Sequence, residues 1–329
     1  MRAYRMTEWG APGRAVSVPD PSPRPGEVLV RVAGCGLCRS DLTMRRIPAA
    51  AGEALGWRMP FTLGHETAGW RVDTGEPVAL VSPSSCGACR HCVRGQESGC
   101  PYGLAGRGYG RDGGLAEYVL VDDPRALLPL GSLDPRHAGP LTDAGATAYH
   151  AVRRALPRIG PGGTAVVVGA GGLGAFAVQF LRVLTAASVV AVDPSPARRS
   201  FALEIGAHNT LSDLSDLSDI DVVLDFVGTD ETITAGIAAV RTGGAFGLIG
   251  SAGGRLTGPW FSSLPRDGEV FTFQGSTIAD AQEVIALAGA GLIRNQVEEF
   301  AFAEIDEAYT KLAAGALTGR AVIVLEQFG

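Results

Sequence analysis

The first part of the chain contains short apolar runs that are broken by proline and glycine. Glu27–Val32 and Leu115–Val121 are two such runs, and both are rich in valine and leucine. Short runs of this kind, bounded by turn residues, are typical of β-strands. The pattern predicts a turn-rich β domain over residues 1–144, with an irregular barrel as its architecture.

The pattern changes at about residue 145, where buried strands alternate with helical segments. The predicted strands are Ala165–Val168, Val189–Val192, Val222–Leu224 and Phe246–Ile249. Such alternation favours right-handed crossovers and a parallel, doubly wound sheet, so we predict a second domain over residues 145–275 with an α/β fold. Within it, we expect the strand at Gly244–Ile249 to form an edge of the sheet.

The remaining residues, 276–329, are predicted to return to the first domain. They contain a helical stretch, Ala279–Ala290, and a final strand, Ala321–Leu325. The tract Leu211–Asp219 repeats with a period of three, which fits neither a helix face nor a strand, so we interpret it as a surface connection.

Composition excludes several classes of protein. The chain has 329 residues, 19% of them charged and 46% hydrophobic, with a net charge of −6. Because no cluster of basic residues stands out, neither nucleic acid nor a membrane surface is an expected partner. Residues 164–181 carry no charge and could pass for a membrane span. Their glycines are bunched after a valine run, which favours a strand, a turn and a helix instead.

Four cysteines, at Cys86, Cys89, Cys92 and Cys100, have a spacing typical of structural zinc. The lobe 86–100 contains few apolar residues, so a bound metal would have to contribute to its folding. The alternative is a disulfide-bonded loop. The opening residues MRAYRMTEWG lack the apolar stretch of a signal peptide, which favours a reducing cytoplasmic location and therefore zinc.

A glycine-rich turn follows the strand Ala165–Val168. Gly169, Gly171 and Gly174 form a G-x-G-x-x-G pattern, and Asp193 ends the next predicted strand. In this context the pattern predicts a dinucleotide site, with the pyrophosphate at the helix N-terminus. The Asp193 carboxylate favours NAD over NADP, although two arginines that follow it, at positions 198 and 199, argue mildly for NADP. The alternative is a packed βαβ turn without a ligand.

A second metal site would need a thiolate, an imidazole and one further ligand. Cys38 and His65 are candidates, although a buried thiol and a core histidine are commoner roles for such residues. Asp143 is a candidate for the third ligand. The spacing of these three residues in the sequence does not establish the site.

These motifs together resemble the zinc-dependent medium-chain alcohol dehydrogenases, and closely the actinobacterial NAD-dependent secondary alcohol dehydrogenases. The resemblance runs almost end to end and rests on the segment Cys38–Leu42, on Gly64–Glu66, on the four-cysteine lobe, on Leu141–Gly145 and on the glycine turn with Asp193. It implies a GroES-like β-rich catalytic domain, a Rossmann domain and two zinc ions per chain. In relatives of this kind, zinc acts as a Lewis acid and hydride passes between a secondary alcohol and NAD.

The resemblance also implies roles for individual residues. Cys38, His65 and Asp143 would bind the catalytic zinc, Glu66 would lie beside it, and Ser40 would bond the substrate hydroxyl. The cofactor-binding positions would be Arg39, Thr147, Gly169, Gly171, Gly172, Leu173, Gly174, Asp193, Arg198, Phe226, Val227, Ile249, Gly250, Ser251 and Arg320. The substrate pocket would contain Thr43, Trp57, Ser82, Phe261 and Gln274.

One position departs from the family pattern. Several members end their proton relay with a histidine five residues after the first zinc-ligand cysteine, and here that position is Thr43. The pocket positions mix large aromatic and polar groups, so a bulky or polyfunctional substrate is compatible with them.

The sequence therefore predicts a zinc- and NAD-dependent dehydrogenase or ketone reductase for secondary alcohols. The alternatives are a polyol or sugar dehydrogenase and a dedicated biosynthetic carbonyl reductase. A non-catalytic NAD-binding protein and a zinc-free quinone reductase are disfavoured, because both would be expected to lack the metal ligands. The resemblance further implies a homo-oligomer, with a tetramer ahead of a dimer.

Overall fold

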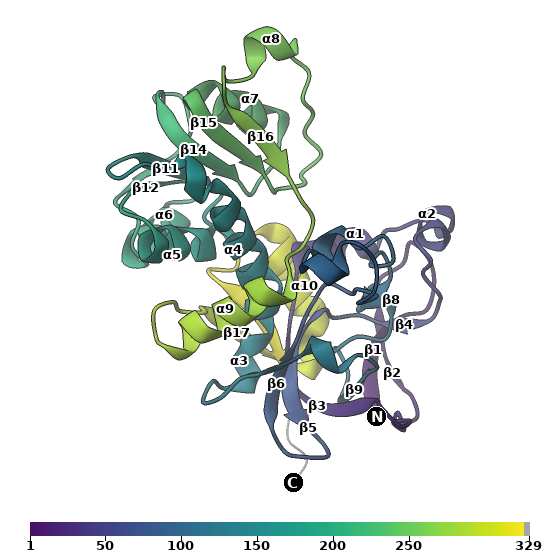
Figure 1. Ribbon diagram of the computed structural model, residues 1–329. Coiled ribbons are helices and arrows are strands. Elements are labelled where there is room, and N and C mark those ends of the chain that lie inside the picture. Colours follow the sequence, from purple (N-terminus) through teal and green to yellow (C-terminus); the bar gives the residue numbers. More distant parts are fainter. Residues whose placement is uncertain (326–329) are drawn as a thin grey trace. The chain divides into compact units, whose positions relative to one another are not determined.

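The computed structural model describes residues 1–325, and the chain divides into two compact units. One unit contains residues 1–146 and the chain from residue 275 onward, and the other contains residues 147–274. The boundary falls inside helix α4 (Ala144–Ala155), between Ala146 and Thr147. Each unit has a sheet of its own (Figure 1).

The first unit is built around the long strand β3 (Val28–Gly36). The first half of β3 pairs with β9 (Tyr118–Val121), its second half pairs with β18 (Arg320–Val324), and β5 (Glu66–Arg71) lies along its other side. The final strand of the described chain thus joins the sheet of the first unit. The sheet continues with β6 (Pro77–Leu80) and β10 (Leu127–Pro129) beyond β5, and with β17 (Val297–Ala301) beyond β18.

Small residues in β3 allow other groups to approach the strand closely. A Cβ atom on Gly34 would lie 2.0 Å from the carbonyl oxygen of Arg136, and one on Gly36 would lie 2.0 Å from Oε2 of Glu66. Both approaches require glycine, and glycine interrupts the apolar pattern of the strand. Sequence patterning therefore predicts only the run Glu27–Val32, whereas the strand continues to Gly36.

Shorter elements complete the first unit. The smaller sheets contain β1 (Arg2–Met6), β2 (Arg14–Ser17) and β4 (Phe61–Thr62), and β7 (Gly106–Arg107) with β8 (Gly110–Arg111). The helices are α1 (Arg39–Met44), α2 (Ala49–Ala54), α3 (Pro135–Ala138), α9 (Ile278–Gly289) and α10 (Ile305–Ala314). The short 3-10 helices are η1 (Cys92–Arg94), η2 (Glu97–Gly99), η3 (Pro124–Ala126), η4 (Gly139–Thr142) and η6 (Phe302–Glu304).

The second unit contains a six-stranded parallel sheet with the order β13-β12-β11-β14-β15-β16. Its strands are β11 (Thr164–Val168), β12 (Ser188–Val192), β13 (Asn209–Leu211), β14 (Ile220–Asp225), β15 (Val240–Leu248) and β16 (Glu269–Thr272). The helices and the one 3-10 turn are α5 (Gly174–Leu184), α6 (Pro196–Glu204), α7 (Asp230–Ala239), α8 (Trp260–Ser263) and η5 (Leu156–Arg158). The strand order reverses between β11 and β14, which is the topological switch point where ligands bind in doubly wound folds.

The prediction that Gly244–Ile249 forms an edge of the sheet is wrong. β15, which contains most of Gly244–Ile249, pairs with β14 on one side and with β16 on the other. Within the described chain, β16 forms this edge of the sheet. β16 has only four residues, two of them charged or polar, and therefore left no apolar run in the sequence.

The structure also describes the two segments whose sequence patterns were difficult to interpret, residues 164–181 and Leu211–Asp219. Residues 164–181 form β11, a glycine turn and the start of α5, as predicted. Among residues 1–325, no helix combines the length and the apolar character needed to cross a membrane. The tract Leu211–Asp219 begins at the end of β13 and continues as an irregular connection, which Leu214 anchors in the core of the second unit.

Candidate functional site

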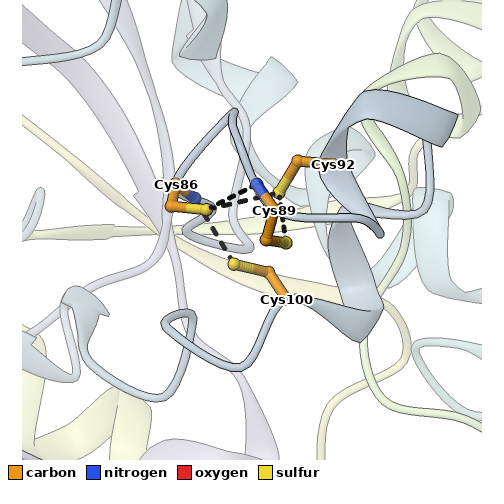
Figure 2. A group of neighbouring side chains, drawn as sticks. All are labelled: Cys86, Cys89, Cys92 and Cys100. Atoms are coloured by element: carbon orange, nitrogen blue, oxygen red, sulfur yellow. Dashed lines mark hydrogen bonds between the residues drawn. The ribbon is translucent and has the colours of Figure 1, made fainter.

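The four cysteines of the lobe 86–100 come together as predicted (Figure 2). Their sulfur atoms all lie within 4.8 Å of one another. Sγ of Cys92 is 3.9 Å from Sγ of Cys86 and 3.5 Å from Sγ of Cys89, distances far beyond the roughly 2.05 Å of a disulfide. All six cysteines lie in the described chain as free thiols. The geometry therefore favours a tetrahedral metal site over the disulfide alternative.

Backbone N–H groups support negative charge on this cluster. The N–H groups of Ala88 and Cys89 lower the pKa of Cys86 to about 6. Burial instead raises the pKa of Cys92 to about 11 in the metal-free protein. A bound cation would favour the thiolate form of all four residues, so the donor set fits zinc.

A second cluster contains Cys38, His65 and Asp143. Their ligand atoms also lie within 4.8 Å of one another. Cys38 stands directly before α1, His65 directly before β5, and Asp143 between η4 and α4. One sulfur, one imidazole nitrogen and one carboxylate oxygen make a three-ligand set of the kind found in catalytic zinc sites, which keep a fourth position open.

The local backbone explains why His65 can enter this cluster. Gly64 has a φ of +97°, and a Cβ atom there would lie 2.6 Å from Sγ of Cys35. Only glycine fits at this position, directly before the histidine. Cys35 itself is a buried thiol in contact with Thr67, and burial raises its pKa to about 12, so it behaves as a packing residue.

The two ring nitrogens of His65 face different partners. Nδ1 lies 3.2 Å from Oδ1 of Asp41, and Nε2 lies 3.5 Å from Oδ2 of Asp143 and 3.4 Å from Oγ of Ser40. Burial by itself lowers the pKa of His65, but the carboxylates of Asp41 and Asp143 outweigh it and hold that pKa well above its ordinary value in the metal-free protein. A carboxylate on one nitrogen and a metal on the other is a common arrangement for histidine ligands.

Asp143 is held as a carboxylate. Burial raises its pKa, but the contact with His65 more than offsets this effect and leaves the pKa below its ordinary value. The hydroxyl of Ser82 donates to Oδ1 of Asp143 at 3.4 Å. The side chain can therefore offer Oδ2 to a cation.

Glu66 and Arg320 form a buried ion pair next to this cluster. Arg320 donates from Nη2 to Oε1 of Glu66 and, at 3.0 Å, to the carbonyl oxygen of Leu37. Burial raises the pKa of Glu66 to about 7, against the opposing effect of Arg320. Arg320 was predicted to bind the cofactor, and in the structure its guanidinium contacts Glu66 and the carbonyl group of Leu37.

The glycine turn of the second unit has the geometry that a dinucleotide requires. Gly169 has a φ of +85°, and a Cβ atom on Gly174 would lie 1.8 Å from the carbonyl oxygen of Gly169. Around Gly171, nothing lies within 4 Å of the position of a Cβ atom, so backbone and phosphate can approach each other there. Gly172 and Leu173 complete the turn before α5.

Asp193 is buried at the end of β12, beside this turn. Its two carboxylate oxygens accept hydrogen bonds from the N–H groups of Ala170 at 3.0 Å and Ser195 at 2.9 Å. Nη1 of Arg198 lies 3.6 Å from Oδ2 of Asp193. Arg199 instead donates to the carbonyl oxygens of Asp193 and Pro194, so its charge is directed at the backbone.

Most of the other predicted cofactor residues of the second unit follow the carboxyl ends of β14 and β15. A Cβ atom on Gly169 would lie 2.7 Å from a methyl carbon of Val227, and one on Gly250 would lie 2.2 Å from the backbone of Val227. Asp225 organises this region: its Oδ1 accepts from the N–H groups of Val227 and Gly228, and its backbone oxygen accepts from those of Ile249 and Gly250. The remaining residues of this set are the half-buried Phe226, the exposed Ser251 and Thr147 on α4.

The predicted pocket residues have varied surroundings. In the first unit, Thr43 is exposed on α1, as is the predicted cofactor residue Arg39, and Ser82 is buried beside Asp143. Trp57 is buried, donates from Nε1 to the carbonyl oxygen of Leu104 at 2.8 Å and packs edge-on against Phe61. In the second unit, Phe261 and Gln274 are exposed.

Asp41 and Asp225 were missed by the sequence analysis. Each is a fully buried carboxylate that orients a functional segment. Asp41 follows Cys38 by three residues and caps the same short helix, and Asp225 ends an apolar strand. An acidic residue at the end of a buried strand, or three residues after a candidate ligand, is the signal that could have identified them.

Comparison with known proteins assigns the chain to a family. The model of the alcohol dehydrogenase GroES-like domain matches residues 24–132, and that of the zinc-binding dehydrogenase matches residues 172–290. An NAD-dependent alcohol dehydrogenase of Sulfurisphaera tokodaii is 32% identical, with 98% of this chain and 100% of the relative covered. A D-arabinose 1-dehydrogenase (NADP+) of Saccharolobus solfataricus is 31% identical, with 98% and 97% covered.

Solved structures agree with this assignment. The alcohol dehydrogenase of Aeropyrum pernix has a TM-score of 0.87 at 29% identity, with 98% of this chain and 100% of that chain covered. The acetophenone reductase of Geotrichum candidum, solved with NAD, has a TM-score of 0.88 at 28% identity, with 99% and 97% covered. The fold and the two metal clusters define a dehydrogenase with a GroES-like domain and a Rossmann-type domain. The chain belongs to the zinc-binding alcohol dehydrogenase family, with NAD and zinc as its cofactors.

We expect two zinc ions per chain, because the described residues form two separate ligand groups. Cys89→Ser should remove one ion and lower the thermal midpoint, since the lobe has little apolar core of its own. Cys38→Ser should remove the other ion and abolish turnover while the midpoint changes less. Elemental analysis and calorimetry measure both effects. Cys35→Ser, at a buried thiol outside both clusters, is the control and should retain both ions.

We also expect Asp193 to determine the cofactor preference. Asp193→Ser removes the carboxylate that would repel a 2′-phosphate, so the ratio of kcat/KM for NADH to that for NADPH should fall by about tenfold or more. Steady-state kinetics with both cofactors provides the measurement. Asp213→Ser, on the exposed connection after β13, is the matched control and should leave the ratio unchanged. A wild-type preference for NADPH would contradict the assignment.

Proposed function

We propose that the enzyme interconverts secondary alcohols and ketones at the cluster of Cys38, His65 and Asp143. The observation that carries this proposal is the convergence of these three ligand atoms, with the hydroxyl of Ser40 3.4 Å from Nε2 of His65. A zinc ion held there would supply Lewis acidity toward an alcohol or carbonyl oxygen, and bound NAD would accept or return the hydride.

The surrounding residues would prepare the site for this reaction. Asp41 orients the imidazole of His65, and Ser82 orients the carboxylate of Asp143. Arg320 neutralises Glu66 beside them and so limits the negative charge of the cluster. These contacts would keep the ligands oriented toward a bound ion.

Ser40 would take part in proton transfer. Its hydroxyl oxygen can accept the proton of a substrate alcohol that is positioned beside His65. Ser40 and Thr43 are three residues apart on α1, which places them on the same face of the helix, and both are exposed. As Ser40 accepts this proton, its own hydroxyl proton would pass to water on this exposed face, without the histidine that several relatives have at the position of Thr43.

The second unit would hold the cofactor at the switch point of its sheet. The turn from Gly169 to Gly174 would bind the pyrophosphate, and Asp193 would accept hydrogen bonds from the adenosine ribose. Phe226, Val227, Ile249 and Gly250 would lie along the nicotinamide half, because they gather at the carboxyl ends of β14 and β15. Arg39, Thr147, Leu173, Arg198, Ser251 and Arg320 complete the proposed contacts.

A sugar or polyol is the second candidate substrate. The relative of Saccharolobus solfataricus oxidises D-arabinose, as its name states, and it is as similar to this chain as the alcohol dehydrogenases are. The proposed pocket positions Thr43, Ser82 and Gln274 are polar and could bind additional hydroxyl groups. Trp57 and Phe261 would instead favour an aromatic substituent.

We infer that the enzyme is a homo-oligomer of the cytoplasm. The free thiols of the zinc lobe suit a reducing compartment. In the second unit, Trp260 and Phe261 on α8 are 73% and 84% exposed and pack edge-on against each other. In the chain, α8 lies on the connection from β15 to the edge strand β16, and Figure 1 shows that this connection extends beyond the sheet. The second unit thus has both an exposed aromatic pair and an unpaired edge strand, and either could form a two-fold contact between copies; such dimers can pair into tetramers.

A substrate panel tests the proposed reaction. With NADH, acetophenone-type ketones should be reduced with higher kcat/KM than ketoses, and with NAD secondary alcohols should be oxidised in preference to polyols and aldoses. Asp143→Ala should lower kcat more than about a hundredfold, because it removes a metal ligand, while NADH binding measured by fluorescence stays within about twofold. Preference for aldoses would establish the sugar dehydrogenase instead.

Light scattering tests the proposed assembly. At micromolar concentration the measured mass should be that of a tetramer or a dimer of the 34.0 kDa chain. Replacing both Trp260 and Phe261 with serine should shift the mass toward that of the monomer, because the apolar contact is lost. Val72→Ser, at an exposed apolar residue of the first unit, is the control and should leave the mass unchanged. A monomeric wild-type enzyme would contradict the proposal.

A further inference from the structure

The carboxylate of Asp41 contacts different groups with its two oxygens. Oδ1 lies 3.2 Å from Nδ1 of His65. Oδ2 accepts hydrogen bonds from two donors, the backbone N–H of Cys38 at 3.0 Å and the hydroxyl of Tyr309 at 3.3 Å. Asp41 is completely buried, so water does not compete for these positions. The orientation of Oδ1 toward His65 therefore depends on the two donors that hold Oδ2.

Tyr309 reaches Asp41 from a distant part of the chain. It lies on α10, 268 residues after Asp41, and is 2% exposed. α1, which carries Asp41, has only six residues and can contribute little rigidity by itself. The hydroxyl of Tyr309 thus ties the short helix beside the metal cluster to the longer α10.

The ring of Tyr309 is itself fixed by its neighbours. The guanidinium carbon of Arg45 lies 4.2 Å from the ring centroid, and the ring of Tyr4 packs at 6.0 Å. Arg45 also lies 3.4 Å from the hydroxyl of Tyr4 and 3.7 Å from the carboxylate of Asp306. A cation above the ring and an aromatic neighbour leave the hydroxyl of Tyr309 directed at Asp41.

We propose that Tyr309 is a positioning residue for the catalytic zinc site. Its hydroxyl holds Asp41 so that Oδ1 stays 3.2 Å from Nδ1 of His65. The negative charge there favours a proton on Nδ1, which leaves the lone pair of Nε2 for the side of Cys38 and Asp143. Tyr309 acts through Asp41 and touches neither metal nor substrate. The inference rests on the proposed function only in taking Cys38, His65 and Asp143 as the ligands of a zinc ion.

Tyr4 provides a matched control. Its ring belongs to the same buried cluster, but its hydroxyl contacts Asp306 and Arg45, and no hydrogen bond joins it to Asp41. Tyr309→Phe and Tyr4→Phe each remove one hydroxyl and keep the ring. A purely structural role for these hydroxyls would affect both variants in the same way, whereas a positioning role would affect the metal site in Tyr309→Phe alone.

The experiment measures metal binding as well as activity. Zinc release from the purified holoenzyme to a chromogenic chelator is followed without substrate, at a temperature well below the unfolding midpoint of every variant. Tyr309→Phe should release one of its two zinc ions about tenfold faster than the wild type. It should also change the visible spectrum of the enzyme with cobalt in the catalytic site, and lower kcat with KM for NADH unchanged. Tyr4→Phe should stay within about twofold of the wild type in each measurement.

A double-mutant cycle tests whether Tyr309 acts through Asp41. Asp41→Asn should accelerate zinc release by itself, and adding Tyr309→Phe should then change the rate by less than about twofold. An equal effect of Tyr309→Phe and Tyr4→Phe, or a full additional effect in the Asp41→Asn background, would overturn the proposal. The two proposals can fail separately. If the wild type were inactive on all alcohols, ketones and sugars, the proposed function would be contradicted. Faster zinc release in Tyr309→Phe would still support this inference.

Discussion

The cluster of Cys38, His65 and Asp143 depends on the compensation of buried charge. Asp41 is buried on α1, and His65, Glu66 and Arg320 are buried where β5 and β18 begin. An ionised group in such a place is tolerated only with a partner of opposite charge or with several hydrogen bonds. Each of these four groups has such a partner, and the pairings leave few alternative orientations. The contacts that neutralise these buried charges therefore also fix the positions of the metal ligands.

The second unit meets the same constraint with backbone donors. Asp193 and Asp225 are buried at the ends of β12 and β14, and each accepts hydrogen bonds from N–H groups of adjacent turns. These bonds satisfy the carboxylates and shape the loops at the switch point of the sheet. The residues that are proposed to bind the cofactor therefore have their backbone conformation set by two acidic side chains, only one of which is expected to touch the cofactor.

The sequence predicted those features whose chemistry lies within a short stretch of chain. The four cysteines and the glycine turn each fall within about fifteen residues, so their spacing alone restricts the geometry. Cys38, His65 and Asp143 are far apart, and family resemblance was needed to bring them together. The contact of Tyr309 with Asp41 has no signal in the sequence, because it depends on the packing of α10 against α1. The edge of the sheet was misplaced because β16 is too short and too polar to give an apolar run.

The two metal clusters differ in the groups that surround their ligands. In the lobe 86–100 the thiols are held by turns and by N–H groups of the same lobe, and Cys86 and Cys89 are accessible to solvent. Metal binding and folding are therefore coupled there. Around His65 and Asp143, by contrast, side chains outside the ligand set contact the ligands or hold those that do: Asp41 on α1, Tyr309 on α10 and Ser82 after β6. Such contacts suit a centre whose fourth position must stay open to substrate, because the protein then helps the ion to maintain the geometry during turnover.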